Sequence, residues 1–228
     1  MTVFGSKFLD GHIIVEINHF DYIVDTGSPV SFGRGGSIFI NGQSFLLNHS
    51  AMNLTPDSIS KLSGLRIDGV IGMDILSKFD IQFSLDEILF SNTAIHHSDL
   101  AIVLPVIDTA MIVPIISLTI AGEYRRLFFD TGAKLSYLSN DLLSGVPMGQ
   151  RQDFHPSIGR YTTNVYMIDV GIQTNVESLT FGSLPPSLTI LLEMGQAAGV
   201  VGTELLNKYT ITLSNSTQTL VLEPNIEN

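Results

Sequence analysis

Short runs rich in β-branched and aromatic residues alternate with clusters of turn-forming residues along most of the chain, a pattern that predicts β-strands. The strands expected in the first half cover residues 2–9, 12–18, 20–24, 37–47 (as a hairpin), 68–72 and 81–85. Those expected in the second half cover residues 112–121, 124–129 and 161–170. Short helices are predicted over residues 56–63, 74–78 and 140–143. The polar stretch 89–99 is interpreted as a link between the halves, and the pattern as a whole indicates an all-β protein.

One apolar stretch, residues 100–120, has the length of a membrane span. It contains Asp108, Pro105 and Pro114, which a membrane-spanning helix tolerates poorly. Two buried strands joined by a turn near Asp108-Thr109 explain the stretch better, so no membrane span is predicted.

Two sequence phrases each occur twice. Residues 22–32 and 127–137 both consist of an apolar strand, Asp-Thr-Gly, a small residue, two spacer residues, a serine and an aromatic residue. Residues 68–84 align without a gap with residues 198–214, and both contain an apolar-apolar-Gly strand end followed by a short helix pattern. A single Asp-Thr-Gly is a weak signal, but two copies in this setting are a strong one and indicate an internal repeat.

The doubled motif resembles the pepsin and retropepsin superfamily of aspartic proteases over residues 10–90 and 105–222. The resemblance implies a bilobal, pepsin-like acid protease fold, with two retropepsin-like β lobes related by a pseudo-twofold axis. We expect an N-terminal lobe over residues 1–95 and a C-terminal lobe over residues 96–228. Because one chain supplies both motifs, a monomer is expected rather than a homodimer of the retroviral kind.

By this resemblance, Asp25 and Asp130 are the catalytic pair of an aspartic endopeptidase, and the substrate is a peptide or protein. Two carboxyl groups about 3 Å apart cannot both ionise, so the pair holds one proton over a wide pH range. One carboxylate takes a proton from a water as it attacks the peptide carbonyl, and the other group donates a proton to the carbonyl oxygen. No metal and no cofactor are expected for this route.

The residues that follow each aspartate are expected to support it. Ser28 can donate its hydroxyl to Asp25, whereas Ala133 cannot do the same for Asp130. We therefore predict that Asp25 is the ionised member of the pair and that Asp130 is protonated. The resemblance implies that the two threonines hydrogen-bond across the lobe interface, and the two glycines allow a tight turn. The expected support residues are Thr26, Gly27, Ser28, Thr131, Gly132 and Ala133.

The second repeat is longer than the first. Asp25 precedes Gly72 by 47 residues and Asp130 precedes Gly202 by 72, so the second half carries 25 additional residues. They fall between about residues 144 and 176, where turn-forming residues separate β-rich flanks. This pattern predicts a hairpin that resembles the flap of the superfamily, present in full only in the second lobe.

The candidate substrate-binding residues of this flap are Ile158, Gly159 and Tyr161. Pepsins carry a tyrosine on their flap, and Tyr166 is a second candidate for that role. Two other interpretations stay open. In the first, the hairpin is an ordinary surface hairpin that points away from the cleft. In the second, Tyr161 is a cross-strand packing residue.

The composition of the chain excludes several other classes of function. With a net charge of −11 and no basic run, the chain is a poor candidate for binding nucleic acid. It contains no cysteine, which excludes disulfides and thiol chemistry, and no signal peptide is visible. A cytoplasmic location is therefore expected, with secretion as an open alternative. His96 and His97 have no carboxylate at a metal-ligand spacing, so no metal site is predicted.

A second function is compatible with the same residues, namely a non-catalytic peptide-binding or scaffold protein on an aspartic-protease fold. Two intact Asp-Thr-Gly motifs favour the enzyme, because a binding protein has no need of two adjacent carboxylates. Asp74 and Glu204 also match each other in the repeat. Their positions at the start of helical turns favour helix-end stabilisation over catalysis.

Overall fold

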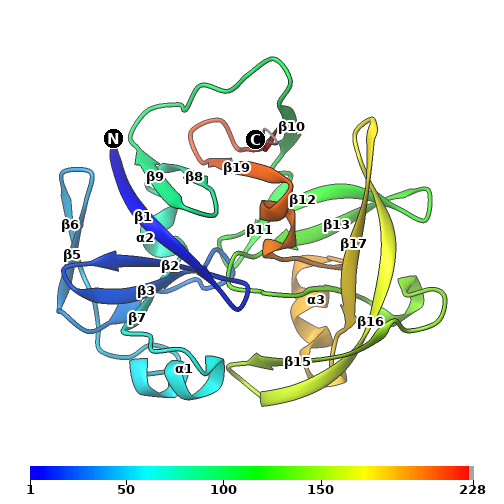
Figure 1. Cartoon of the computed structure of the whole chain (residues 1–228), viewed down its shortest axis with the longest axis horizontal. Coiled ribbons are helices and arrows are strands. Elements are labelled where there is room, and N and C mark those ends of the chain that lie inside the picture. The colour runs from blue at the N-terminus through cyan, green and yellow to red at the C-terminus, as the bar shows by residue number, and fades with distance from the viewer. Residues whose placement is uncertain (226–228) are drawn as a thin grey trace.

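Strands make up most of the regular structure in the computed structural model, which describes residues 1–225 (Figure 1). The all-β class predicted from the sequence pattern is confirmed. Two large sheets and one small sheet contain the strands of the described residues. The small sheet is the predicted hairpin of β5 (Ser37–Ile40) and β6 (Gln43–Leu46). Asn41 and Gly42 form its turn with positive φ angles of 47° and 82°.

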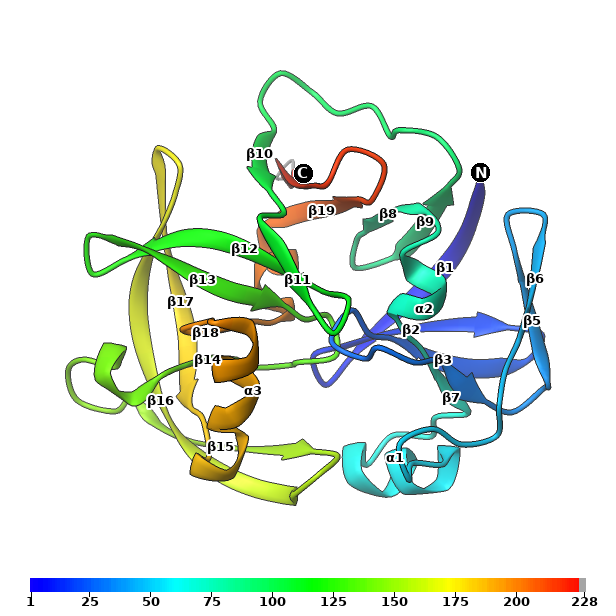
Figure 2. The ribbon, with the colours of Figure 1, turned by 180° about the vertical axis from the view of Figure 1, so that it is seen from behind.

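The first large sheet has ten strands and contains most of the strands of the first half (Figures 1 and 2). In sheet order, its strands are β10 (Ile102–Pro105), β20 (Thr219–Pro224), β19 (Tyr209–Ser214), β8 (Asp80–Phe83), β9 (Glu87–Ser91), β1 (Thr2–Leu9), β2 (His12–Ile17), β3 (Phe20–Val24), β7 (Gly69–Ile71) and β4 (Phe32–Gly33). β1 alternates between half-buried and exposed residues, whereas β2 is buried on both faces along most of its length.

The second large sheet has eight strands, all from the second half. In sheet order, they are β11 (Asp108–Ala110), β12 (Val113–Ile120), β13 (Glu123–Phe129), β18 (Gly199–Val201), β14 (Ser136–Leu138), β17 (Asn175–Ser183), β16 (Gly159–Ile172) and β15 (Gly149–His155). An additional pairing joins β16 back to β12. The sheet therefore curls around its own apolar interior.

Helices are short, and they lie at the ends of strands or in the connections between them. They are α1 (Pro56–Ser63), α2 (Met73–Leu76), α3 (Thr189–Gly195) and the 3₁₀ turns η1 (Asn140–Leu142), η2 (Pro186–Leu188) and η3 (Thr203–Asn207). α1 begins where predicted, because Thr55 and Ser58 form a capping box around Pro56. Within residues 1–225, no helix has the length and apolar character needed to cross a membrane.

The sequence repeat reappears in the strand topology. In the first half, β3 pairs in parallel with β7, and β4 pairs with β7 from its other side in the antiparallel sense. In the second half, β13 pairs in parallel with β18, and β14 pairs with β18 in the antiparallel sense. Each Asp-Thr-Gly therefore follows the first strand of an equivalent three-stranded unit.

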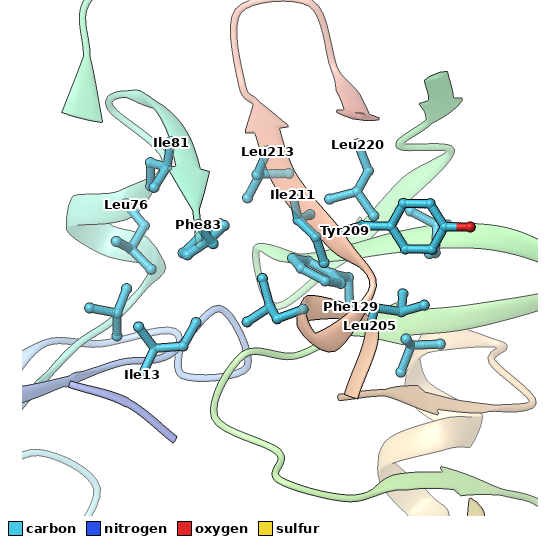
Figure 3. Packing of buried hydrophobic residues seen from close by; sticks show 14 of the residues in the cluster. Ile13, Leu76, Ile81, Phe83, Phe129, Leu205, Tyr209, Ile211, Leu213 and Leu220 are labelled. Atoms are coloured by element: carbon cyan, nitrogen blue, oxygen red, sulfur yellow. The ribbon is translucent and has the colours of Figure 1, made fainter. Parts of the chain in front are cut away.

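The two halves share both a sheet and a core. β19 of the second half pairs with β8 of the first, with Leu213 opposite Ile81. The side chains of these strands pack with residues of both halves in one large cluster (Figure 3). Within it, the rings of Phe83 and Phe129 meet edge to face with centroids 6.4 Å apart. These contacts cross the boundary that the sequence predicts between residues 95 and 96.

Two local predictions were wrong. The stretch 89–99 is not a link throughout, because its first three residues complete β9 and Phe90 is fully buried. The turn expected at Asp108-Thr109 lies instead at Met111-Ile112, which have φ angles of 52° and 62°. Asp108 and Thr109 pair as a short strand with β12. The residue types do not explain the observed turn, because a positive φ is unusual for a β-branched residue such as Ile112.

Candidate active site

Asp25 and Asp130 occupy equivalent places, directly after β3 and β13. The backbone N–H of Asp25 donates to the Ile71 carbonyl at 3.0 Å, and that of Asp130 donates to the Val201 carbonyl at 3.0 Å. Ile71 and Val201 are fully buried at the ends of β7 and β18. Each aspartate is thus fixed to the parallel strand beside its own.

Thr26 and Thr131 join the two loops through buried hydrogen bonds. The Thr26 hydroxyl accepts from the Thr131 backbone N–H at 2.9 Å and donates to the Phe129 carbonyl at 2.8 Å. The Thr131 hydroxyl accepts from the Thr26 N–H at 3.0 Å and donates to the Val24 carbonyl at 2.8 Å. The hydrogen bonds expected across the interface are therefore present, and they place the two aspartates opposite each other.

The two carboxyl groups face each other across the glycines. A Cβ added to Gly27 would lie 2.3 Å from the carboxyl atoms of Asp130, and one added to Gly132 would lie 2.3 Å from the carboxyl carbon of Asp25. No side chain fits at either place, which explains the glycine in both motifs. The Gly27 and Gly132 N–H groups donate to Asp25 Oδ1 and Asp130 Oδ1, each at 2.8 Å. The carboxyl groups also hydrogen-bond to each other.

This enclosure raises the pKa of both carboxyl groups, because burial penalises their charged forms. The pKa of Asp25 is raised well above its usual range, since the charge of Asp130 and the hydrogen bond between the carboxyl groups add to burial. Backbone N–H groups of Gly132, Ala133 and Gly27 act in the opposite direction on the pKa of Asp130. The surroundings therefore favour a proton that the two carboxyl groups share.

The reason for our prediction that Asp25 is the ionised member is not supported, because the Ser28 hydroxyl does not bind Asp25. The Ser28 hydroxyl donates to the Val30 carbonyl at 3.0 Å and not to Asp25. Only its backbone N–H reaches the Asp25 carboxyl group, at 2.9 Å. Ala133 offers the matching backbone N–H to Asp130. The difference between serine and alanine at this position therefore gives no reason for the pKa values of the two carboxyl groups to differ.

A serine six residues after each aspartate fixes the loop to the glycine that ends the neighbouring strand. The Ser31 hydroxyl accepts from the Gly72 N–H at 2.8 Å, and the Ser136 hydroxyl accepts from the Gly202 N–H at 3.0 Å. Both serines are buried. The repeated motif contains them, but the sequence gives no sign of their partners, which lie 41 and 66 residues away.

Asp74 and Glu204 lie in the first turns of α2 and η3, as expected, and each also connects distant segments. Asp74 Oδ1 accepts from the backbone N–H of Ser31 at 2.9 Å and from its hydroxyl at 2.5 Å. Glu204 accepts from the backbone N–H of Thr180 on β17 at 2.7 Å. In the first half, the carboxylate therefore holds the Asp-Thr-Gly loop itself.

A cavity of about 380 Å³ lies against both carboxyl groups. Its wall is mostly apolar and comes from both halves of the chain. The apolar side chains of this wall include Ile23, Phe32, Ile59, Phe128, Leu188 and Leu192. Such a wall, with a few polar groups at its centre, suits an extended ligand with apolar side chains.

The predicted hairpin is formed by β15 and β16 (Figure 1). Residues of its turn line the cavity. Phe154 and His155 belong to the cavity wall. Arg160 reaches α1 in the other half, where Nε donates to the Leu62 carbonyl and Nη2 to the Lys61 carbonyl, each at 3.0 Å. The interpretation that the hairpin points away from the cleft is therefore wrong.

Of the three candidate flap residues, Tyr161 lines the cavity, but Ile158 and Gly159 do not. Ile158 is 37% exposed at the turn, and Gly159 has a φ of 77° that allows the chain to reverse. The expectation that these two residues contact substrate is therefore not supported by their positions. Tyr166 packs against the large core instead of the cavity.

Tyr161 also takes part in a buried polar network, which agrees with its interpretation as a cross-strand packing residue. Its hydroxyl donates to that of Tyr137 at 2.8 Å, and Tyr137 donates to Asp153. Burial raises the pKa of Tyr161 to about 12, and burial together with the Asp153 charge raises the pKa of Tyr137. Burial likewise raises the pKa of Asp153. The network joins the hairpin, close to its turn, to β14 where it meets the cavity.

Neither a metal centre nor a known relative indicates the chemistry of this site. Residues 1–225 contain no group of three or more side chains placed to hold a metal ion. No model of a known protein family matches the chain, and no curated protein matches it. The chemistry of the site therefore rests on its geometry.

Proposed function

We propose that this chain is a single-chain aspartic endopeptidase with the bilobal fold of the pepsin and retropepsin superfamily. The observation that carries the proposal is the pair of carboxyl groups, one from each Asp-Thr-Gly loop, that face and hydrogen-bond to each other. The reciprocal threonine bonds and the equivalent three-stranded units support a pseudo-twofold relation between the halves.

In the proposed reaction, a water lies between Asp25 and Asp130. Asp130 takes a proton from this water as the oxygen attacks the peptide carbonyl carbon, and Asp25 donates its proton to the carbonyl oxygen. The tetrahedral intermediate then breaks its C–N bond as Asp130 gives its proton to the amine nitrogen and one hydroxyl of the intermediate returns a proton to Asp25. The assignment of the base to Asp130 and of the acid to Asp25 is part of this proposal.

The cavity and the hairpin support a peptide as the substrate. An extended peptide places alternate side chains against the apolar wall. A hairpin over the cleft excludes water and can add backbone hydrogen bonds to such a strand.

The test is cleavage of a denatured protein between pH 3 and pH 7 by the wild type and by the variants Asp25→Asn and Asp130→Asn. Each variant is expected to lose at least about a hundredfold in rate, because it removes one of the two proton-transfer groups. Asp86→Asn, at an exposed position in a turn between β8 and β9, is the matched control and should keep the activity. Equal activity in all four proteins would reject the assignment of the pair.

The mostly apolar wall also suits the second candidate, a peptide-binding protein that does not cleave. That function would appear as stable binding of an unmodified peptide by the wild type, with no cleavage at any pH in the range.

A further inference from the structure

His12, the first residue of β2, is a buried polar residue of the cavity wall that the proposed reaction does not use. It is 1% exposed, and neither ring nitrogen has a hydrogen-bond partner within residues 1–225. The backbone of Gly132 lies near the ring, but the contact lacks the geometry of a good hydrogen bond. The Phe154 ring of the hairpin lies on its other side, with centroids 5.7 Å apart. His12 thus sits between the Asp130 loop and the hairpin.

The other buried polar side chains of the wall have partners within the protein. Tyr161, Tyr137 and Asp153 satisfy one another, as described above. The His155 ring accepts from the backbone N–H of Ser157 at 3.2 Å. Buried polar groups in proteins are almost always hydrogen-bonded, so an unpaired one in a binding cavity calls for a partner.

The charge state of His12 determines which chemical groups can bind its ring nitrogens. Burial is the main cause that lowers its pKa to about 4, and Lys134 acts in the same direction, while Asp10 opposes them. Lys134 and Asp10 form an ion pair at 2.9 Å, so their fields largely cancel at the ring. The ring is therefore neutral above about pH 4, with one nitrogen as a donor and the other as an acceptor.

We propose that His12 selects peptide substrates that carry an uncharged hydrogen-bonding side chain, a carboxamide or a hydroxyl, near the cleaved bond. A charged side chain would lose its hydration against this apolar wall, and an apolar one would leave both ring nitrogens unpaired. This inference rests on the proposed function of the site, but it concerns recognition and not the proton transfers. His12 is a specificity residue, because it acts through the substrate side chain.

The first experiment compares cleavage of a peptide library by the wild type, His12→Met, His12→Gln and His49→Met. We expect the wild type to prefer Asn, Gln, Ser and Thr over Leu at one position, and His12→Met to lose about threefold to tenfold of that preference. Its kcat/KM for the Leu peptides should not fall. His12→Gln keeps a donor and an acceptor and should keep the preference, and His49→Met, at an exposed position, should match the wild type.

Three results would overturn the inference: no such preference in the wild type, an equal preference in His12→Met, or a uniform fall in kcat/KM for all peptides. The uniform fall would mean that His12 acts on the fold or on the peptide backbone.

A second experiment keeps the inference testable if the chain does not hydrolyse peptides. The Kd of the same peptides is measured on Asp25→Asn protein with and without His12→Met, and the same threefold to tenfold selective change is expected. The Tm of ligand-free His12→Met protein should equal or exceed that of the wild type, since the substitution removes unpaired polar atoms from the interior. A lower Tm would show that the ring has partners within the protein and would contradict the inference.

Discussion

The hydroxyl groups of Thr26 and Thr131 show why single side chains matter at this site. Each one accepts from and donates to backbone groups of the opposite half, and all of these groups are buried. Valine has the same shape but would leave the buried Thr131 N–H without its acceptor and the Phe129 carbonyl without its donor. Because such orphaned groups cost free energy, threonine is required at these positions for a chemical and not a steric reason.

The dyad also makes the stability of the fold depend on pH. The pKa of Asp25 is raised in the folded protein above the ordinary value of 3.8. Its contribution to the free energy of unfolding is therefore fully present below about pH 3.8 and is lost as the pH rises through the folded pKa. At pH 7, Asp25→Asn should raise the Tm, because the substitution removes the cost of ionising a buried carboxyl group.

Calorimetry of the wild type and Asp25→Asn from pH 3.5 to pH 7.5 checks this expectation, and the difference in Tm should shrink toward the acid end. His12, with its pKa lowered to about 4, adds the opposite dependence, losing stability as the pH falls from 6.5 toward 4. Both proteins contain His12, so its effect cancels in the difference. A higher Tm for the wild type at pH 7 would contradict the raised pKa.

At the scale of elements, the sequence predicted the strands, the two loops and the inserted hairpin from alternation and from the lengths of the repeats. It could not predict which hairpin residues face the cavity, because a shift of one residue exchanges the two faces of a strand. In the structure, Tyr161 lines the cavity, whereas Ile158 lies at the turn and is 37% exposed. His12 escaped notice because a histidine in an apolar strand carries no motif.

The hairpin depends on Arg160 for its contact with the first half, since this side chain donates to two carbonyls at the end of α1. These carbonyls lack partners within the helix, and a cation is favourable there. Arg160→Met should make backbone amides over residues 149–165 exchange hydrogen about tenfold faster, the equivalent of one lost charge-assisted pair of bonds.

Hydrogen exchange measured by mass spectrometry tests this effect against Arg151→Met. Arg151 is exposed on the same hairpin and makes no side-chain hydrogen bond or ion pair within residues 1–225, so its loss should leave the exchange unchanged. Equal protection in both variants would show that the contact with α1 does not hold the hairpin.

At the scale of the whole molecule, one chain provides both carboxyl groups and the sheet that holds them together. The pairing of β8 with β19 and the shared core need no second copy of the chain. The sequence indicated this from two motifs in one chain, but it could not indicate the pairing itself. Ile81 and Leu213 are 132 residues apart, and no local pattern specifies a partner at that distance.

Proteolytic activity per chain should therefore be independent of protein concentration from about 10 nM to 10 µM, unlike that of an enzyme whose site forms between two copies. Initial rates divided by enzyme concentration provide the measurement, and sedimentation at the same concentrations provides the mass. Specific activity that rises with concentration would indicate that the active form is a dimer.

Residues 92–101, between β9 and β10, form an irregular and mostly exposed stretch. In this architecture, the stretch is not needed to hold the two halves in contact. The pairing of β8 with β19 and the hydrogen bonds of the two threonines hold the halves together. The stretch therefore serves as a tether that keeps the local concentration of the halves high. A nick within it would sever covalent continuity but leave every one of those contacts in place. The two fragments would then stay associated and carry a complete site, as if they were two subunits.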